Sequence, residues 1–228
     1  MVAALSACGS MRTAPANPAP TSPADAFERL WDAMEEAAPS QPAPEVSIGC
    51  VSHPAIDVWE ERLRAGGPAW AATVHGVARG AQYLDQVRAI LEEEGVPASL
   101  ALLPVIESSF RPEASAPDGG RGLWQLHART ARRFGLVVSR RRDDRIDTER
   151  ATRAAARYLR LLYQRYNDWP LALAAYNAGE GRVDRALSRL PGSSFWKLAE
   201  ARHLPATSCD YVPRFLAVVR VVQAEHGC

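Results

Sequence analysis

Apolar residues recur at helical spacing along most of this chain, and glycine or proline interrupts them at short intervals. Ile56, Trp59 and Leu63 form one such apolar face, and the longest face lies within residues 147–166. A repeat of three to four residues predicts helices that bury one side. Residues 46–51 are the only candidate for the alternating pattern of a strand. The sequence therefore predicts an all-α fold.

The ends of the expected helices follow from glycine, proline and capping residues that border the apolar faces. The expected helices cover residues 24–38, 56–63, 83–91, 123–134, 147–166, 169–178, 183–190 and 208–225. Pro104 is expected to bend or end a helix, because it lacks a backbone donor.

Composition excludes several classes of protein. The chain has 228 residues, of which 47% are hydrophobic and 23% charged, which is typical of a globular domain with a tail. A net charge of +1 does not favour binding to nucleic acid. The cysteines form no C-x-x-C pair and the histidines form no H-E-x-x-H motif, so we expect neither a metal nor a cofactor.

The first residues resemble the end of a bacterial lipoprotein signal. Leu5 to Cys8 read L-S-A-C, which is similar to the lipobox whose cysteine is lipidated. The seven preceding residues include no basic one, so we expect the true start of translation to lie upstream. We predict a truncated signal at 1–8, a Pro/Ala-rich tether with a short helix at 9–45 and a folded domain at 46–228. Cys8 would then anchor the chain to a membrane.

The remaining cysteines allow at most one disulfide if Cys8 is lipidated. Cys209 and Cys228 flank one expected helix, which would hold them about 28 Å apart at 1.5 Å per residue. A disulfide therefore requires Cys50, and we favour its pairing with Cys228.

Glu107 is the only charged residue between Val96 and Phe110. Apolar surroundings raise the pKa of a carboxyl, and a carboxyl that is protonated near neutral pH can act as a general acid. If Pro104 ends a helix just before it, Glu107 lies at a helix end that a ligand can reach. The alternative is an exposed acid at a frayed helix end, followed by Ser108 and Ser109 in solvent.

Three other segments carry residues suited to binding sugars. Trp124 and Gln125 follow the glycine-rich loop 118–122, and they offer a stacking face and an amide; the alternative is a turn before a core tryptophan. Asn177 precedes Gly179, so it either binds a ligand or caps a turn. Tyr176 and Tyr211 either face a ligand or pack in the core.

Taken together, these segments closely resemble the lytic transglycosylases of glycoside hydrolase family 23, especially the membrane-bound murein transglycosylase D type. The resemblance covers about residues 83–222. It is carried by ALLPVIESSF (101–110), GLWQL (122–126), AAYNAGEGRV (174–183) and YVPRF (211–215), in the order that the family has them. The resemblance implies a lysozyme-like all-α fold of the goose type. It also implies the activity of the family, which cleaves peptidoglycan between N-acetylmuramic acid and N-acetylglucosamine.

The resemblance also implies roles for individual residues. Glu107 would be the only catalytic acid and base, and Tyr211 would hydrogen-bond near the reacting centre. Ser108 would orient the site or the acetamido group of the substrate. Gln125 and Asn177 would contact the glycan, and Tyr176 would shape the wall of the site. The substrate-binding set expected from the motifs is Ser108, Ser109, Trp124, Gln125, Tyr176 and Asn177.

The reaction that the resemblance implies uses no water. Glu107 would protonate the glycosidic oxygen and then accept the proton of the muramic acid 6-hydroxyl, which closes a 1,6-anhydro ring. Two alternatives remain: a hydrolytic muramidase with Asp118 or Glu113 as a second acid, and an inactive peptidoglycan-binding protein of the same fold. The implied location is the cell envelope, as a periplasmic and outer-membrane lipoprotein that acts in wall remodelling or turnover.

Three features depart from the family pattern. Residues 205–210 lack the Glu-Thr pair that often precedes the Tyr-Val-Pro motif, and residues 118–120 replace a usual Gly-Ala. No LysM repeat follows the domain. Retention at the wall would then depend on the lipid anchor and on the site itself.

Overall fold

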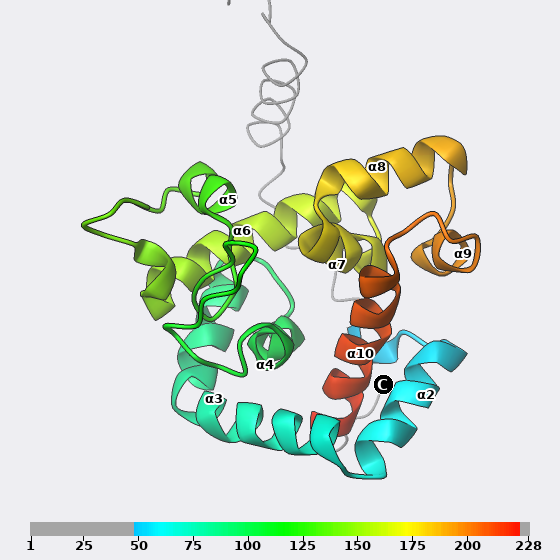
Figure 1. Ribbon diagram of the computed structural model, residues 1–228, viewed down its shortest axis with the longest axis horizontal. Helices are drawn as coiled ribbons and strands as arrows, with labels where there is room; N and C mark the ends of the chain where they lie inside the picture. The colour runs from blue at the N-terminus through cyan, green and yellow to red at the C-terminus, as the bar shows by residue number, and fades with distance from the viewer. Residues whose placement is uncertain (1–47, 224–228) are drawn as a thin grey trace, which may run out of the picture. The chain divides into compact units, whose positions relative to one another are not determined.

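The computed structural model describes residues 48–223, which all belong to one compact unit (Figure 1). The predicted signal with Cys8, the tether with its helix at 24–38, and Cys228 lie outside these residues. So do residues 46–47 of the candidate strand, whose described part, Ile48–Cys50, is a 3₁₀ turn. Within the described residues, no helix combines the length and the apolarity needed to cross a bilayer.

Helices and short 3₁₀ turns make up the regular structure of residues 48–223, and their only β-pairing consists of three isolated bridges. The α-helices are α2 (Pro54–Arg64), α3 (Pro68–Glu93), α4 (Leu103–Glu107), α5 (Ala128–Arg133), α6 (Thr148–Tyr166), α7 (Trp169–Ala178), α8 (Glu180–Arg189), α9 (Phe195–Glu200) and α10 (Ala206–Val222). The 3₁₀ turns are η1 (Ile48–Cys50), η2 (Ala98–Leu102) and η3 (Asp144–Ile146). The predicted all-α class is confirmed for this part of the chain.

Helices α6, α7 and α10 build the centre of the core. Helix α6 begins at Thr148 because the Asp147 side chain accepts a hydrogen bond from the backbone N–H of Arg150, as capping chemistry predicts. Helix α7 is apolar on almost every side and is buried except near its end, where Tyr176 and Asn177 lie. It packs against α6, α8 and α10, so the side chains at its end are held between three helices (Figure 1).

Two glycines in α3 let α4 and the residues after it come close. A Cβ atom on Gly76 would lie 3.2 Å from Cγ1 of Val105, and one on Gly80 would lie 2.7 Å from the ring of Phe110. No side chain fits at Gly80 without moving that ring, because such a contact is far below van der Waals distance. Helix α3 is therefore a platform that fixes where α4 ends.

Several expected bounds were wrong for identifiable reasons. Residues 123–127 are not helical, because Gln125 has a φ of 49° and Leu126 pairs with Arg121. Helix α3 starts at Pro68, well before the apolar face that predicted residues 83–91, since its first half is rich in alanine and glycine. Helix α9 was not predicted at all. Pro104 lies in the first turn of α4 rather than at the end of a helix.

Candidate active site

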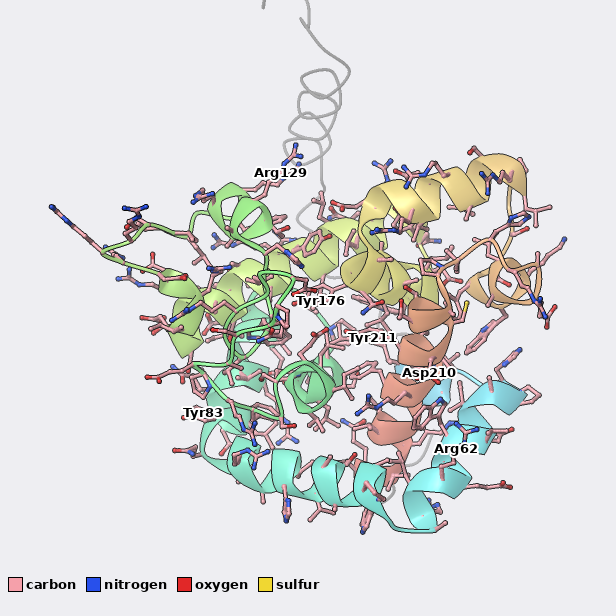
Figure 2. The ribbon with its side chains drawn as sticks, in the orientation of Figure 1. Arg62, Tyr83, Arg129, Tyr176, Asp210 and Tyr211 are labelled. Atoms are coloured by element: carbon pink, nitrogen blue, oxygen red, sulfur yellow. The ribbon has the colours of Figure 1, made fainter. Side chains whose placement is uncertain are left out.

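Glu107 is the last residue of α4, so the prediction that it lies at a helix end is confirmed. Its side chain is half-buried, and the hydroxyl of Tyr211 on α10 donates a short hydrogen bond to its Oε1 atom. The two residues come from opposite ends of the predicted motif set, and packing of α10 against α7 and η2 brings them together. Figure 2 labels Tyr176 and Tyr211, which project toward the region between α4, α7 and α10 in this view.

Burial sets the protonation of this carboxyl. The pKa of Glu107 is raised from 4.5 to about 7, mainly because the carboxyl loses hydration and to a smaller degree because of the negative charge of Asp118. The hydrogen bond from Tyr211 and the positive charge of Arg214 act in the opposite direction. At neutral pH the carboxyl is therefore divided between its acid and its base forms, which suits a group that must first give and then accept a proton.

Ser108 holds the backbone just beyond Glu107. Its hydroxyl donates to the carbonyl oxygen of Leu123 at 2.9 Å and accepts from the N–H of Arg111 at 3.2 Å. Ser108 is buried and its hydrogen bonds are made within the protein. Of the two roles that the resemblance implies, this geometry favours orientation of the site over contact with an acetamido group.

Ser109 continues the turn that follows the acid. Its φ is 52°, which is rare for a residue with a side chain, and its carbonyl accepts a 2.7 Å hydrogen bond from Nε of Arg79 on α3. That contact fixes the strained backbone beside Glu107.

Gln125 lies half-buried in the loop that follows α4, and its backbone also has a positive φ of 49°. Its side-chain Nε2 donates to the carbonyl of Gly122 at 2.7 Å. Gly120 lies directly against it, since a Cβ atom there would be 3.0 Å from Oε1 of Gln125. The glycine-rich loop thus orients the amide, and the unusual Asp118-Gly119-Gly120 sequence is accommodated.

Trp124 requires a correction. Its side chain is 0% exposed, and its indole N–H donates to the hydroxyl of Thr152 on α6 at 2.9 Å. A ring with no accessible face cannot stack on a sugar, so the prediction that Trp124 binds substrate was wrong and the core alternative is correct. Its carbonyl oxygen still serves the site, because it accepts a 2.7 Å hydrogen bond from the hydroxyl of Tyr176.

Tyr176 and Asn177 end α7 on the side toward α10. Burial and the charge of Glu107 raise the pKa of Tyr176 well above its usual value, so its hydroxyl stays protonated as a donor. Asn177 is exposed, and its Oδ1 accepts from the hydroxyl of Ser208 on α10 at 2.8 Å. This bond leaves the amide NH₂ of Asn177 to face solvent or ligand. Asn177 does not cap α7. The capping residue after Ala178 is Gly179, whose φ is 85°.

Sequence reasoning missed Arg214, although it belongs to the YVPRF motif. Arg214 follows Tyr211 by three residues, which places both on one face of α10. Its guanidinium lies 5.7 Å from the ring centre of Trp59 on α2, and the indole N–H of Trp59 donates to Asp210. Helix α2 therefore holds in place a cation whose charge acts on Glu107.

Asp118 and Glu113 are the candidates for the second acid that a hydrolytic muramidase would need. Asp118 is largely exposed, caps the N–H of Gly120 and lies close enough to oppose ionisation of Glu107. Glu113 lines a separate pocket with Arg79 and Tyr83. No cluster of three metal-ligating side chains occurs in residues 48–223.

The described cysteines differ in state. Cys50 is disulfide-bonded, and its partner lies outside the described residues, so its pairing with Cys228 stays a prediction. Cys209 is a free, half-buried thiol, and burial raises its pKa.

Comparison with known proteins finds relatives that are named lytic murein transglycosylases. Residues 87–199 match the transglycosylase SLT domain family. The chain is 34% identical over 150 residues to a membrane-bound lytic murein transglycosylase D of Escherichia coli, covering 64% of this chain and 32% of that protein. It is 40% identical over 114 residues to a putative tributyltin chloride resistance protein of an Alteromonas species, covering 50% and 55%. The chain thus spans about a third of the first relative.

Solved structures agree in fold. The 70-kDa soluble lytic transglycosylase of Escherichia coli superposes with a TM-score of 0.55 and 26% identity, over 64% of this chain and 24% of that one. A 70-kDa soluble lytic transglycosylase in complex with bulgecin A gives a TM-score of 0.56 and 26% identity, over 64% and 25%. The predicted lysozyme-like all-α fold is confirmed, and it is the fold of these lytic transglycosylases.

Proposed function

Because residues 87–199 of this chain form a transglycosylase SLT domain, we propose that the protein is a peptidoglycan lytic transglycosylase. It cleaves the β-1,4 bond between N-acetylmuramic acid and N-acetylglucosamine and forms 1,6-anhydro-muramic acid. The observation that carries the proposal is the half-buried Glu107 carboxyl, whose pKa of about 7 suits both halves of the reaction.

The proposed reaction begins with the protonated carboxyl. Because Oε1 accepts the hydrogen bond from Tyr211, Oε2 carries the proton that passes to the glycosidic oxygen. The bond between that oxygen and the anomeric carbon breaks, and N-acetylglucosamine leaves as an alcohol. The carboxylate then takes the proton of the muramic acid 6-hydroxyl, whose oxygen bonds to the anomeric carbon. The acid is regenerated, so one carboxyl completes the cycle.

The neighbours of Glu107 support this cycle. Tyr211 fixes one oxygen of the carboxyl, while Arg214 offsets part of the cost of ionising a desolvated acid. The substrate supplies its own nucleophile, so proximity within one sugar ring replaces a bound water. Gln125, Tyr176 and Asn177 are proposed to contact the glycan, and Ser108 and Ser109 to hold the backbone at the acid.

Hydrolysis is the second candidate, and the position of Asp118 is the observation that favours it. Its carboxylate is close enough to raise the pKa of Glu107. A hydrolase of the usual kind needs such a second carboxylate to activate water. Asp118 is exposed beside His127, however, whereas a single acid is sufficient for the transglycosylase reaction.

The assignment of the acid is tested with Glu107→Gln. The amide keeps the shape of the side chain but has no proton to transfer. We expect release of soluble fragments from purified sacculi to fall by about 10²–10⁴-fold, the usual contribution of general acid–base catalysis. A variant that cleaves as fast as the wild type would show that another group is the acid. Sacculi left intact by the wild type would instead indicate the inactive, wall-binding alternative.

Attachment to the envelope is a further part of the proposal. The name of the Escherichia coli relative describes a membrane-bound protein, and Leu5 to Cys8 resemble a lipobox. A lipid on Cys8 would hold the enzyme at a membrane facing the wall, the outer membrane in a Gram-negative cell, where it would remodel or turn over murein. Expression with the upstream region, followed by cell fractionation of the wild type and Cys8→Ser, tests this; a soluble wild type would contradict it.

A further inference from the structure

A pocket that shares no lining residue with the contacts of Glu107 lies beside α8. It has a volume of about 270 Å³, and it is formed between α8 and the residues that lead into α10. Its lining residues are Arg182, Arg185, Ala186, Arg189, His203, Leu204 and Pro205. The three arginines are spaced by three and four residues, so they project from one face of α8. The pocket therefore has a cationic wall and a small apolar floor.

The arginines of this pocket are not neutralised. Within residues 48–223, no carboxylate lies at ion-pair distance from Arg182, Arg185 or Arg189. The arginines of α6 differ, since Arg153 and Arg157 form ion pairs with Glu93 and Glu94 of the α3 end. The acidic side chain of α8 nearest to them, Asp184, is engaged elsewhere by Arg165 of α6 at 2.8 Å.

Hydrogen bonds connect this pocket to the proposed glycan site. Arg182 donates to the carbonyl of Ala178, the residue after Asn177. On the opposite wall, Pro205 precedes the first turn of α10, where Ser208 donates to Asn177. One turn further along α10, Tyr211 binds Glu107. A glycan strand bound along α10 from Tyr211 to Ser208 would bring its side branches toward these arginines.

We propose that this pocket binds the carboxylates of the peptide stems that branch from the glycan strand. The inference rests on the proposed function, which makes peptidoglycan the polymer in the site. Both sugars of that strand are uncharged where the lactyl group carries a stem, so the negative charges lie in the stems. Guanidinium groups bind carboxylates through paired hydrogen bonds. The pocket volume is at the small end for ligand sites, which suits a branch rather than a sugar chain.

The first experiment measures binding of the free stem tetrapeptide alanyl-isoglutamyl-diaminopimelyl-alanine by calorimetry. Arg185→Gln with Arg189→Gln removes two cations and leaves the contact between Arg182 and Ala178 in place. We expect the affinity to fall about tenfold or more, as loss of charged hydrogen bonds implies. The matched control is Arg140→Gln with Arg141→Gln, which removes the same charge from an exposed loop and should leave the affinity unchanged.

The second experiment compares cleavage of sacculi with cleavage of glycan strands from which an amidase has removed the stems. The proposal predicts that the double variant in α8 has a higher KM than the wild type for sacculi. Its KM for the glycan strands without stems should be unchanged. A wild type that cleaves neither substrate would contradict the proposed function, while the tetrapeptide titration would still decide on the pocket. Equal tetrapeptide affinity in all three proteins would overturn the inference. The inference would also be overturned if the double variant in α8 kept its affinity for the tetrapeptide and lost binding only to phosphatidylglycerol vesicles or to inorganic phosphate.

Discussion

Tyr211 donates a hydrogen bond to Glu107 across 104 positions of sequence, and this contact joins the last helix of the domain to the end of α4. It fixes one oxygen of the acid and lowers a pKa that burial raises. Burial and the charge of Glu107 raise the pKa of Tyr211 itself well above its usual value, so the hydroxyl remains a donor throughout the working pH range.

Removing this donor should change the pH profile of the enzyme. Tyr211→Phe abolishes a hydrogen bond that favours the carboxylate, so the pKa of Glu107 should rise above about 7. Because the first step needs the protonated acid, kcat/KM of the wild type should decline above pH 7, and the decline should move to higher pH in the variant. Its maximal rate should fall, since the carboxyl is no longer oriented. A decline at the same pH in both proteins would show that Tyr211 does not act on this group.

Stability should depend on pH through Glu107. Its folded-state pKa of about 7 lies above its ordinary value of 4.5, so between these two pH values the folded state binds more protons than the unfolded state. The free energy of unfolding should therefore decrease as pH rises from 4.5 to 7, by at most about 3 kcal/mol. The Glu107→Gln variant should lack this decrease in unfolding free energy between pH 4.5 and 7. Parallel urea unfolding curves of both proteins across this range measure it, and a constant difference between them would contradict the burial argument.

The motifs predicted that Glu107 and Tyr211 act together, and the structure joins them. The roles of Gln125 and Asn177 stay predictions, because residue type and motif order do not say what a side chain contacts. Trp124 was misassigned, because an aromatic ring looks the same in a motif whether it is exposed or packed against Thr152. Arg214 was missed, because its effect depends on the face of α10 that it shares with Tyr211.

The helices likewise differ in how much of each the local sequence predicts. Asp147 predicts the start of α6 through local capping, which needs no tertiary information, and Asp168 caps α7 in the same way. The first half of α3 could not be predicted from an apolar face, since Gly76 and Gly80 are there for close packing against α4 and Phe110. The loop before α5 escaped prediction because the positive φ of Gln125 is not visible from its residue type; a hydrogen bond from its side chain to the carbonyl of Gly122 accompanies it.

Trp124 should support stability rather than glycan binding. Trp124→Phe keeps an aromatic ring in the core but leaves the hydroxyl of Thr152 without its donor, which should cost about 1–3 kcal/mol of unfolding free energy. Affinity of the folded protein for glycan strands should equal that of the wild type. Chemical denaturation and a sedimentation assay with sacculi measure the two quantities. Loss of glycan affinity with unchanged stability would restore the stacking role.

The contact between Gly80 and Phe110 should be intolerant of even one methyl group. Gly80→Ala forces the Phe110 ring to move, so we expect a loss of about 1–3 kcal/mol in unfolding free energy. Cleavage should fall as well, because Phe110 ends the turn that begins at Glu107. Gly181→Ala in α8 is the matched control: its Cβ atom meets only the end of Arg185, and a gain of about 0.5–1 kcal/mol is expected. Equal stability of the two variants would contradict the platform role of α3.

In the proposed reaction, Glu107 directs the substrate's own hydroxyl, rather than water, to the anomeric carbon. The most direct test is mass spectrometry of the fragments that the wild type releases from purified sacculi in water enriched in oxygen-18. We expect the released fragments to have 1,6-anhydro-muramic acid ends, which are lighter by one water than a hydrolysis product and free of the heavy isotope. Reducing muramic acid ends that carry one heavy oxygen would contradict it and establish a muramidase.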